Sequence, residues 1–187
     1  GCAASVDREE QFRLAHIGWR KQRGMDPPDA GFPGIRFVML HTFAHALMRQ
    51  LAIECGYTAA SIRERIYSKG PEEEGGPMAG VLIYTAAPDS EGTLGGLVNL
   101  GRAEELGRLI DQALEDVRLC ASDPLCSEHA PTTDGGPRTL HGAACHACGF
   151  SPETSCERGN KYLDRSTLVE TVSGSRHAIF GEWTSRG

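Results

Sequence analysis

Arg36-Phe-Val-Met-Leu-His-Thr-Phe-Ala-His-Ala-Leu-Met-Arg-Gln-Leu-Ala-Ile-Glu-Cys55 contains the longest strongly apolar run of the 187-residue sequence. Apolar residues occupy nearly every position between Phe37 and Met48, which predicts a helix that is buried on all sides. Gly56 follows at a position where helices commonly end. The run is only 12 residues long, whereas a membrane span needs about 20. We therefore expect a core helix and no membrane segment.

Shorter elements are predicted before and after this helix. Residues 7–24 and 102–119 repeat apolar side chains at helical spacing. Residues 66–67 and 80–85 are typical of strands, with an exposed Gly- and Pro-rich loop between them. Ser61-Ile-Arg-Glu64 fits a capping box or a short helical turn.

The fold class expected from this pattern is α+β. A small sheet around residues 79–85 would be flanked by the two long apolar helices, with a cysteine-rich zinc-binding subdomain attached. The chain would divide into an N-terminal helix and linker (1–34), an α/β body (35–119), a cysteine module (120–170) and a tail (171–187). Because the sequence begins with Gly1 rather than Met, we expect a domain taken from a longer protein.

The composition excludes several classes of protein. A net charge of −6 argues against a domain that binds nucleic acid on its own by general electrostatics. The seven cysteines are an odd number and no signal-peptide pattern precedes them, which argues against a secreted disulfide framework. A cytoplasmic compartment with reduced thiols is the better interpretation.

Five of the cysteines lie within 37 residues: Cys120, Cys126, Cys145, Cys148 and Cys156. In the C-x2-C pair, both thiolates can turn toward one ion and take adjacent corners of a zinc tetrahedron. The surrounding segment has too few large apolar residues to fold by burial alone, so the sequence predicts a structural zinc ion. Four ligands are needed and five cysteines are present. The nearby side chains that could replace one are His129, His141 and His146.

His41 and His45 are four residues apart and therefore share one helix face. Zinc proteases use this spacing, but with Glu directly after the first histidine, where Thr42 stands here. We favour two histidines that form hydrogen bonds inside a buried helix.

The loop 88–96 follows an apolar strand and carries Asp89 and Glu91. It lacks the Gly-Lys-Ser/Thr sequence of a phosphate loop, so we expect a structural or partner-contacting loop. After the last cysteine, Asp164 and Arg165 are expected to pair with each other, to fasten the cysteine module to the body, or to be solvated.

Several motifs recur together in an order that resembles one known family. They are His41-Thr-Phe-Ala-His45, Ser61-Ile-Arg-Glu-Arg-Ile-Tyr67, Gly80 to Gly96, Ser122-Asp-Pro-Leu-Cys126, Gly142-Ala-Ala-Cys-His-Ala-Cys148, Glu153 to Asn160 and Leu163-Asp164-Arg165. Over residues 35–170 the sequence resembles the DrmB-like domain of the DISARM phage-defence system, which is related to the zinc-binding domain of MrfA-type DNA-repair helicases.

The resemblance implies a cytoplasmic bacterial protein that acts beside a superfamily 2 helicase partner and handles DNA. The helicase motifs match Cys145, Cys148 and Cys156, which implies that these three bind zinc. The fourth ligand is Cys126 or Cys120, and we favour Cys126 because it sits in a loop that is free to turn inward. The choice stays open because the Cys126–Cys145 spacing is wider than in the helicases and His146 replaces the proline of their Cys-Pro-x-Cys turn.

Two functions are compatible with these patterns. The leading hypothesis is a non-catalytic, zinc-stabilised accessory module that helps a helicase complex to bind DNA or a partner subunit. The alternative is a metal-dependent hydrolase or nuclease that uses His41 and His45 with Asp89 or Glu91.

Overall fold

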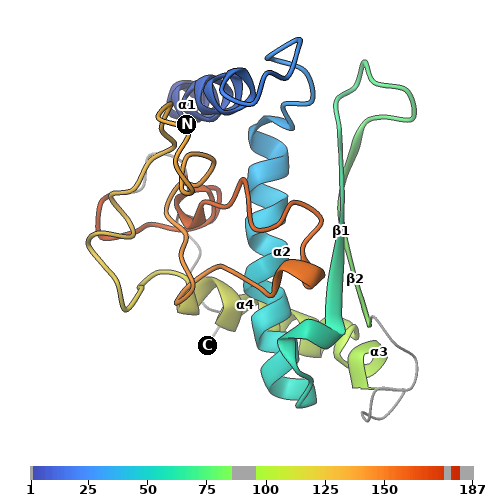
Figure 1. Ribbon diagram of the computed structural model, residues 1–187. Helices are drawn as coiled ribbons and strands as arrows, with labels where there is room; N and C mark the ends of the chain where they lie inside the picture. Colours follow the sequence, from blue (N-terminus) through green and yellow to red (C-terminus); the bar gives the residue numbers. More distant parts are fainter. Residues whose placement is uncertain (1, 86–95, 175–177, 182–187) are drawn as a thin grey trace.

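The computed structural model describes residues 2–85, 96–174 and 178–181 (Figure 1). In chain order its elements are α1 (Cys2–Lys21), α2 (Gly34–Cys55), β1 (Ile62–Lys69), β2 (Met78–Thr85), α3 (Gly96–Leu100) and α4 (Ala103–Asp116). Short 3-10 turns cover Ala59–Ser61, Glu153–Ser155 and Arg165–Thr167. The expected α+β class is confirmed.

Helix α2 is the centre of the molecule (Figure 1). Its apolar run places side chains in three separate core clusters, which explains why it is apolar almost all round. One cluster joins it to α1, one to α4 and residues 168–169, and one to α4 and the start of β1. The helix ends where Gly56 adopts a left-handed φ of 66° and its N–H bonds to the carbonyl of Ile53.

The sheet is a single antiparallel hairpin, paired from Ile62↔Thr85 to Lys69↔Met78. Side chains of β1 alternate between buried and exposed, so one face of the hairpin packs on α2 and the other faces outward. With only two strands the sheet lies along one side of the helix, and the helix takes the central position. Residues 61–64 are therefore not helical: the turn ends at Ser61 and the strand starts at Ile62.

The segment after α4 contains almost no regular structure. Between Val117 and Glu170 it forms only two 3-10 turns, so the predicted final element at 160–172 is limited to Arg165–Thr167. Most of this segment lies on the opposite side of α2 from the hairpin (Figure 1). Across the described ranges, no helix is both long and apolar enough to pass through a bilayer.

Candidate metal centre

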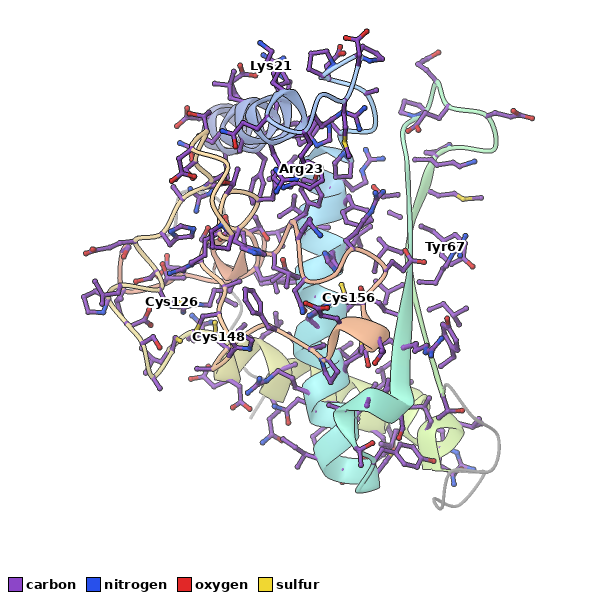
Figure 2. All side chains as sticks on the ribbon, in the orientation of Figure 1. Lys21, Arg23, Tyr67, Cys126, Cys148 and Cys156 are labelled. Carbon is purple, nitrogen blue, oxygen red and sulfur yellow. The ribbon has the colours of Figure 1, made fainter. Side chains whose placement is uncertain are left out.

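Four cysteine side chains from the irregular segment converge on one point. The sulfur atoms of Cys120 and Cys145 lie 3.5 Å apart, those of Cys126 and Cys148 lie 3.6 Å apart, and those of Cys145 and Cys148 lie 3.8 Å apart. All four sulfurs are within 4.8 Å of one another. Cys126 and Cys148 are buried, and Figure 2 shows them on the far side of α2 from the hairpin.

These spacings fit a zinc ion. With a Zn–S bond of about 2.3 Å, two sulfurs at corners of a tetrahedron are about 3.8 Å apart. A disulfide would require about 2.05 Å, which none of these pairs approaches. Hydrogen bonds from Cys148, and then from Cys145 and Cys120, outweigh burial and lower the pKa of Cys126 to about 5. The hydrogen bond with Cys126 raises the pKa of Cys148, and burial raises the pKa of Cys120, so without metal the thiolate form is favoured at Cys126 and opposed at these two neighbours.

The comparisons with known proteins agree with this geometry. Residues 43–149 match the model of the MrfA Zn-binding domain. The chain belongs to this family. It is also 43% identical, over 173 residues, to the DISARM protein DrmB of Bacillus paralicheniformis. That alignment covers 92% of the chain and 29% of the relative, so the chain spans less than a third of the relative's length. The protein is a DrmB-like MrfA Zn-binding domain, and its cofactor is structural zinc.

In this MrfA Zn-binding domain, the loop that carries Cys120 and Cys126 is organised by Asp123. One carboxylate oxygen accepts the backbone N–H of Cys120 at 2.8 Å, and the other accepts that of Ser127 at 3.1 Å. Arg165, which is almost fully buried, forms an ion pair with the same carboxylate. Its guanidinium also donates to the carbonyls of Val117 at 3.0 Å and Arg118 at 2.8 Å. Arg165 thus connects the cysteine loop to the end of α4.

Asp164 fastens the other side of the zinc-binding region. Its fully buried carboxylate accepts from Arg8 Nε at 2.7 Å and from the backbone N–H of Ala143 at 3.1 Å. Its own N–H donates to the Thr42 hydroxyl on α2 at 2.9 Å. Asp164 and Arg165 therefore pair with different partners, and each ties the cysteine segment to a helix.

Cys156 lies in a different place from the other four cysteines. It is next to α2 (Figure 2), where His41 Nε2 is 3.1 Å from its sulfur. The second group consists of His41, His45, Glu64 and Cys156, all buried, with their ligand atoms within 4.8 Å of one another. The structure thus brings Cys120 rather than Cys156 to the sulfur cluster.

The second group is strongly coupled electrostatically. Burial opposes charge on each member, but the close approach of the Cys156 sulfur and the Glu64 carboxylate prevails and raises the pKa of His45 to about 9. The same histidines lower the pKa of Cys156 to about 6 and that of Glu64 to about 2. In this buried setting, Cys156 and Glu64 both favour their negatively charged forms, which positive charge nearby must balance.

None of the other predicted histidines that the structure describes is a member of either group. Asp89 and Glu91 fall outside the described residues. His146 is exposed, and His129 Nε2 donates to the backbone carbonyl of Arg138 at 3.1 Å. His141 is buried against Phe150.

Glu64 was missed by sequence reasoning. The signal was available: Ile62, Glu64 and Ile66 occupy alternate positions, so a carboxylate must share the buried face of a strand with two isoleucines. A charged residue in such a position needs a specific partner.

Proposed function

We propose that Cys120, Cys126, Cys145 and Cys148 bind one structural zinc ion, and that the domain is a non-catalytic accessory module of a DNA-handling helicase complex in anti-phage defence. The observation that carries this proposal is the closure of the cluster. Four protein sulfurs fill the four corners of the tetrahedron, whereas a catalytic zinc keeps one position open for water or substrate.

The zinc ion would stabilise the domain by replacing a core that the segment lacks. Residues 117–170 contain no strand and few large apolar side chains. Structural zinc contributes on the order of 10 kcal/mol in small zinc modules. The alternative hydrolase is less well supported, because His41 and His45 have 0% exposure and no substrate would reach them.

The outer face of the hairpin supports a binding role. Arg63 stands opposite Tyr84, and Arg65 stands opposite Leu82. These side chains and Tyr67 are exposed, Leu82 by 48% and Tyr67 by 41%. Tyr67 projects away from α2 (Figure 2). Exposed tyrosine and arginine on one surface are typical of interfaces with a partner.

The first partner of the domain in this proposal is a protein subunit rather than DNA. The net charge of −6 opposes tight binding of DNA by the isolated domain. The partner would be a superfamily 2 helicase subunit of the same system, and DNA would be reached through the complex.

Co-purification with that helicase subunit tests the proposal. The wild-type chain should be retained, and Tyr67→Ala combined with Arg63→Ala should reduce retention at least tenfold because two anchor side chains are removed. Arg108→Ala is the matched control, since Arg108 is also exposed and ion-paired but lies on α4.

Two outcomes would contradict the proposal. Retention that is unchanged in the hairpin variant would remove the hairpin from the interface. Tight binding of DNA by the isolated chain, falling steeply with salt, would show that DNA rather than a subunit is its first partner.

A further inference from the structure

The four buried groups beside α2 are distinct from the sulfur cluster, and no part of the accessory function explains them. His41 and His45 come from adjacent turns of α2, Glu64 from the inner face of β1, and Cys156 from the turn after Glu153–Ser155. Three separate segments thus contribute to one point: α2 supplies two ligand atoms, and the other two segments supply one each. His41, His45 and Glu64 have exposures of 0%, 0% and 2%.

The histidines are held in the orientation that metal ligands adopt. Nδ1 of His41 lies 3.2 Å from the carbonyl oxygen of Tyr162, and Nδ1 of His45 lies 2.7 Å from that of Gly149. A carbonyl oxygen only accepts, so each Nδ1 carries a proton and donates it. In the neutral ring, the lone pair of each Nε2 then faces the centre of the group. Metal-binding histidines almost always donate their other ring nitrogen in this way.

Backbone N–H groups of nearby residues stabilise the thiolate form of Cys156. Its sulfur accepts the N–H of Asn160 at 3.1 Å and that of Arg158 at 3.4 Å. Asn160 reaches this position with a left-handed φ of 61°, and its side chain is fixed to Ser151 by two hydrogen bonds. Two N–H donors on one sulfur favour negative charge there.

Protein groups alone leave the centre unsatisfied. Nε2 of His41 is 2.8 Å and Nε2 of His45 is 3.4 Å from the same carboxylate oxygen of Glu64. Among the described residues, however, His45 Nε2 and both Glu64 oxygens lack a partner with hydrogen-bond geometry. Buried carboxylates without donors are costly. His45 Nε2 and the Glu64 carboxylate are therefore buried polar groups that the described protein groups do not satisfy.

We propose that His41, His45, Glu64 and Cys156 bind a second metal ion, a divalent transition metal of the zinc class. The charges balance, because one thiolate and one carboxylate neutralise a dication. Two imidazole nitrogens and a thiolate exclude Mg²⁺ and Ca²⁺, which take oxygen ligands. Four protein ligands close the coordination shell, so the ion is structural.

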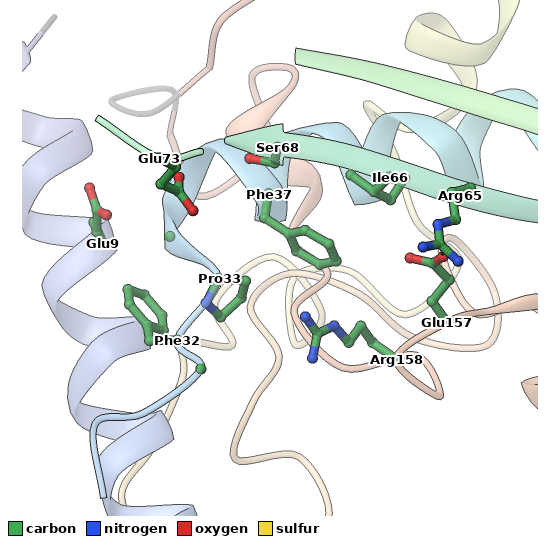
Figure 3. Close-up of a pocket in the computed structure, with 12 residues that line it drawn as sticks. Glu9, Phe32, Pro33, Phe37, Arg65, Ile66, Ser68, Glu73, Glu157 and Arg158 are labelled. Carbon is green, nitrogen blue, oxygen red and sulfur yellow. The ribbon is translucent and has the colours of Figure 1, made fainter. Parts of the chain in front are cut away.

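One pocket comes close to this site without including any of its four residues. It has a volume of about 860 Å³ and lies between α1, the start of α2 and β1 (Figure 3). Phe37 forms part of its wall and packs on His41, with ring centroids 5.2 Å apart. Arg65 and Glu157 pair with each other across the same wall at 3.3 Å. Phe37 thus separates His41 from the pocket, as expected for an ion that is not exchanged with substrate.

The stoichiometry of the purified 187-residue chain gives the first test. Native mass spectrometry of the chain produced in zinc-supplemented medium should show two zinc ions per molecule. One ion per molecule would overturn the proposal. This test is independent of the accessory function, because it concerns no partner.

Substitutions then assign the ions to their sites. Cys156→Ser and Glu64→Gln should each lose one ion and keep the other, and Cys145→Ser should lose the other one. Cys55→Ser is the matched control, because Cys55 belongs to neither group, and it should keep both ions. Retention of both ions by Cys156→Ser and Glu64→Gln would overturn the proposal.

X-ray absorption at the zinc edge covers the case in which a variant does not fold, because it uses the wild-type chain. Sulfur together with nitrogen or oxygen neighbours, and the outer-shell scattering of imidazole, is the expected result. A shell of sulfur alone would mean that only the cysteine cluster holds zinc, and the second site would be rejected.

Discussion

Gly142 is a position where an added methyl group would collide with a buried carboxylate. A Cβ atom there would fall 2.2 Å from a carboxylate oxygen of Asp164. That carboxylate is fully buried and held by Arg8 and Ala143, so it has no room to retreat. Gly142→Ala should lower the free energy of unfolding by about 2 kcal/mol, as measured by urea denaturation.

Gly107→Ala is the matched control for this prediction. Gly107 lies inside α4, and nothing stands within 4 Å of an added Cβ. Alanine is the better helix former, so this variant should gain up to about 1 kcal/mol. Equal loss of stability in both variants would show that the Asp164 contact is not the cause.

His141 should make the domain sensitive to mild acid. Burial, followed by the positive charges of His129, Arg138 and Lys161, lowers its pKa to about 4. In the unfolded chain the imidazole takes up a proton near its ordinary pKa of about 6.5, whereas the folded chain resists it until about 4. The contribution of neutral His141 to the free energy of unfolding is therefore fully present above pH 6.5. It is lost as the pH falls from 6.5 toward 4, by about 3 kcal/mol in all.

The measurement is urea denaturation at several pH values, compared with His141→Gln. Acid also releases zinc from thiolates, but this affects both proteins alike. The difference between wild type and variant should therefore shrink as the pH falls. A difference that does not depend on pH would show that His141 titrates normally in the folded state.

At the residue scale, the sequence predicted zinc and grouped Cys156 with Cys126, Cys145 and Cys148, whereas the structure gathers Cys120 with those three and places Cys156 beside the histidines. The spacing of Cys145 and Cys148 places them together in any fold. Whether Cys120 or Cys156 joins them depends on how residues 127–144 return to α2, and that path is set by contacts such as Asp164 with Arg8. No local pattern encodes such a contact.

Between elements, Arg165 is the main connection from α4 to the cysteine loop. Arg165→Met would remove the ion partner of the Asp123 carboxylate and the guanidinium that donates to the carbonyls of Val117 and Arg118. Removing one member of a buried pair costs about 3 kcal/mol. Because Asp123 also holds the N–H of Cys120, zinc affinity should fall at least tenfold.

Competition with a chromophoric chelator measures that affinity, and thermal denaturation measures the stability. Arg108→Met is the control, because its ion pairs with Glu54 and Glu105 are exposed and contribute little. If Arg165→Met and Arg108→Met release zinc equally, the proposed connection does not support the site.

The helices were the most predictable elements, because their apolar spacing reports burial directly. The expected ranges 7–24, 36–55 and 102–119 correspond to α1, α2 and α4. α3 was not expected, since five residues are too few to show a period. Glu64 was read as part of a capping box, although its alternation with Ile62 and Ile66 indicated a strand.

Across the whole molecule, removal of metal should affect one half more than the other. After treatment with a strong zinc chelator, amide hydrogens in residues 117–163 should exchange fastest, because this segment has little regular structure to protect them. The core of α2 and α4, held by Leu47, Leu51 and Leu109, should keep more protection. Uniform loss of protection would show that zinc and the helical core unfold as one unit.

The general architecture follows from the sequence only in part. A helix that is apolar on every side must be surrounded, and that much could be predicted for α2. The segments that surround α2 could not be predicted in the same way. One of them is the irregular segment after α4, whose course follows from metal ligands and buried ion pairs rather than from a periodic pattern.

The bond between Arg8 and Asp164 joins residues 156 positions apart, and this has a consequence for how the chain is made. The ribosome completes α1 long before Asp164 is synthesised. During that time the Arg8 guanidinium lacks the carboxylate that neutralises it in the folded protein. In the same way, His41 and His45 are synthesised well before Cys156, which lies 115 residues after His41. Contacts of such long range close late. A nascent chain interrupted before residue 164 would therefore keep unpaired charges on its helices, and cellular proteases could distinguish it from a finished copy.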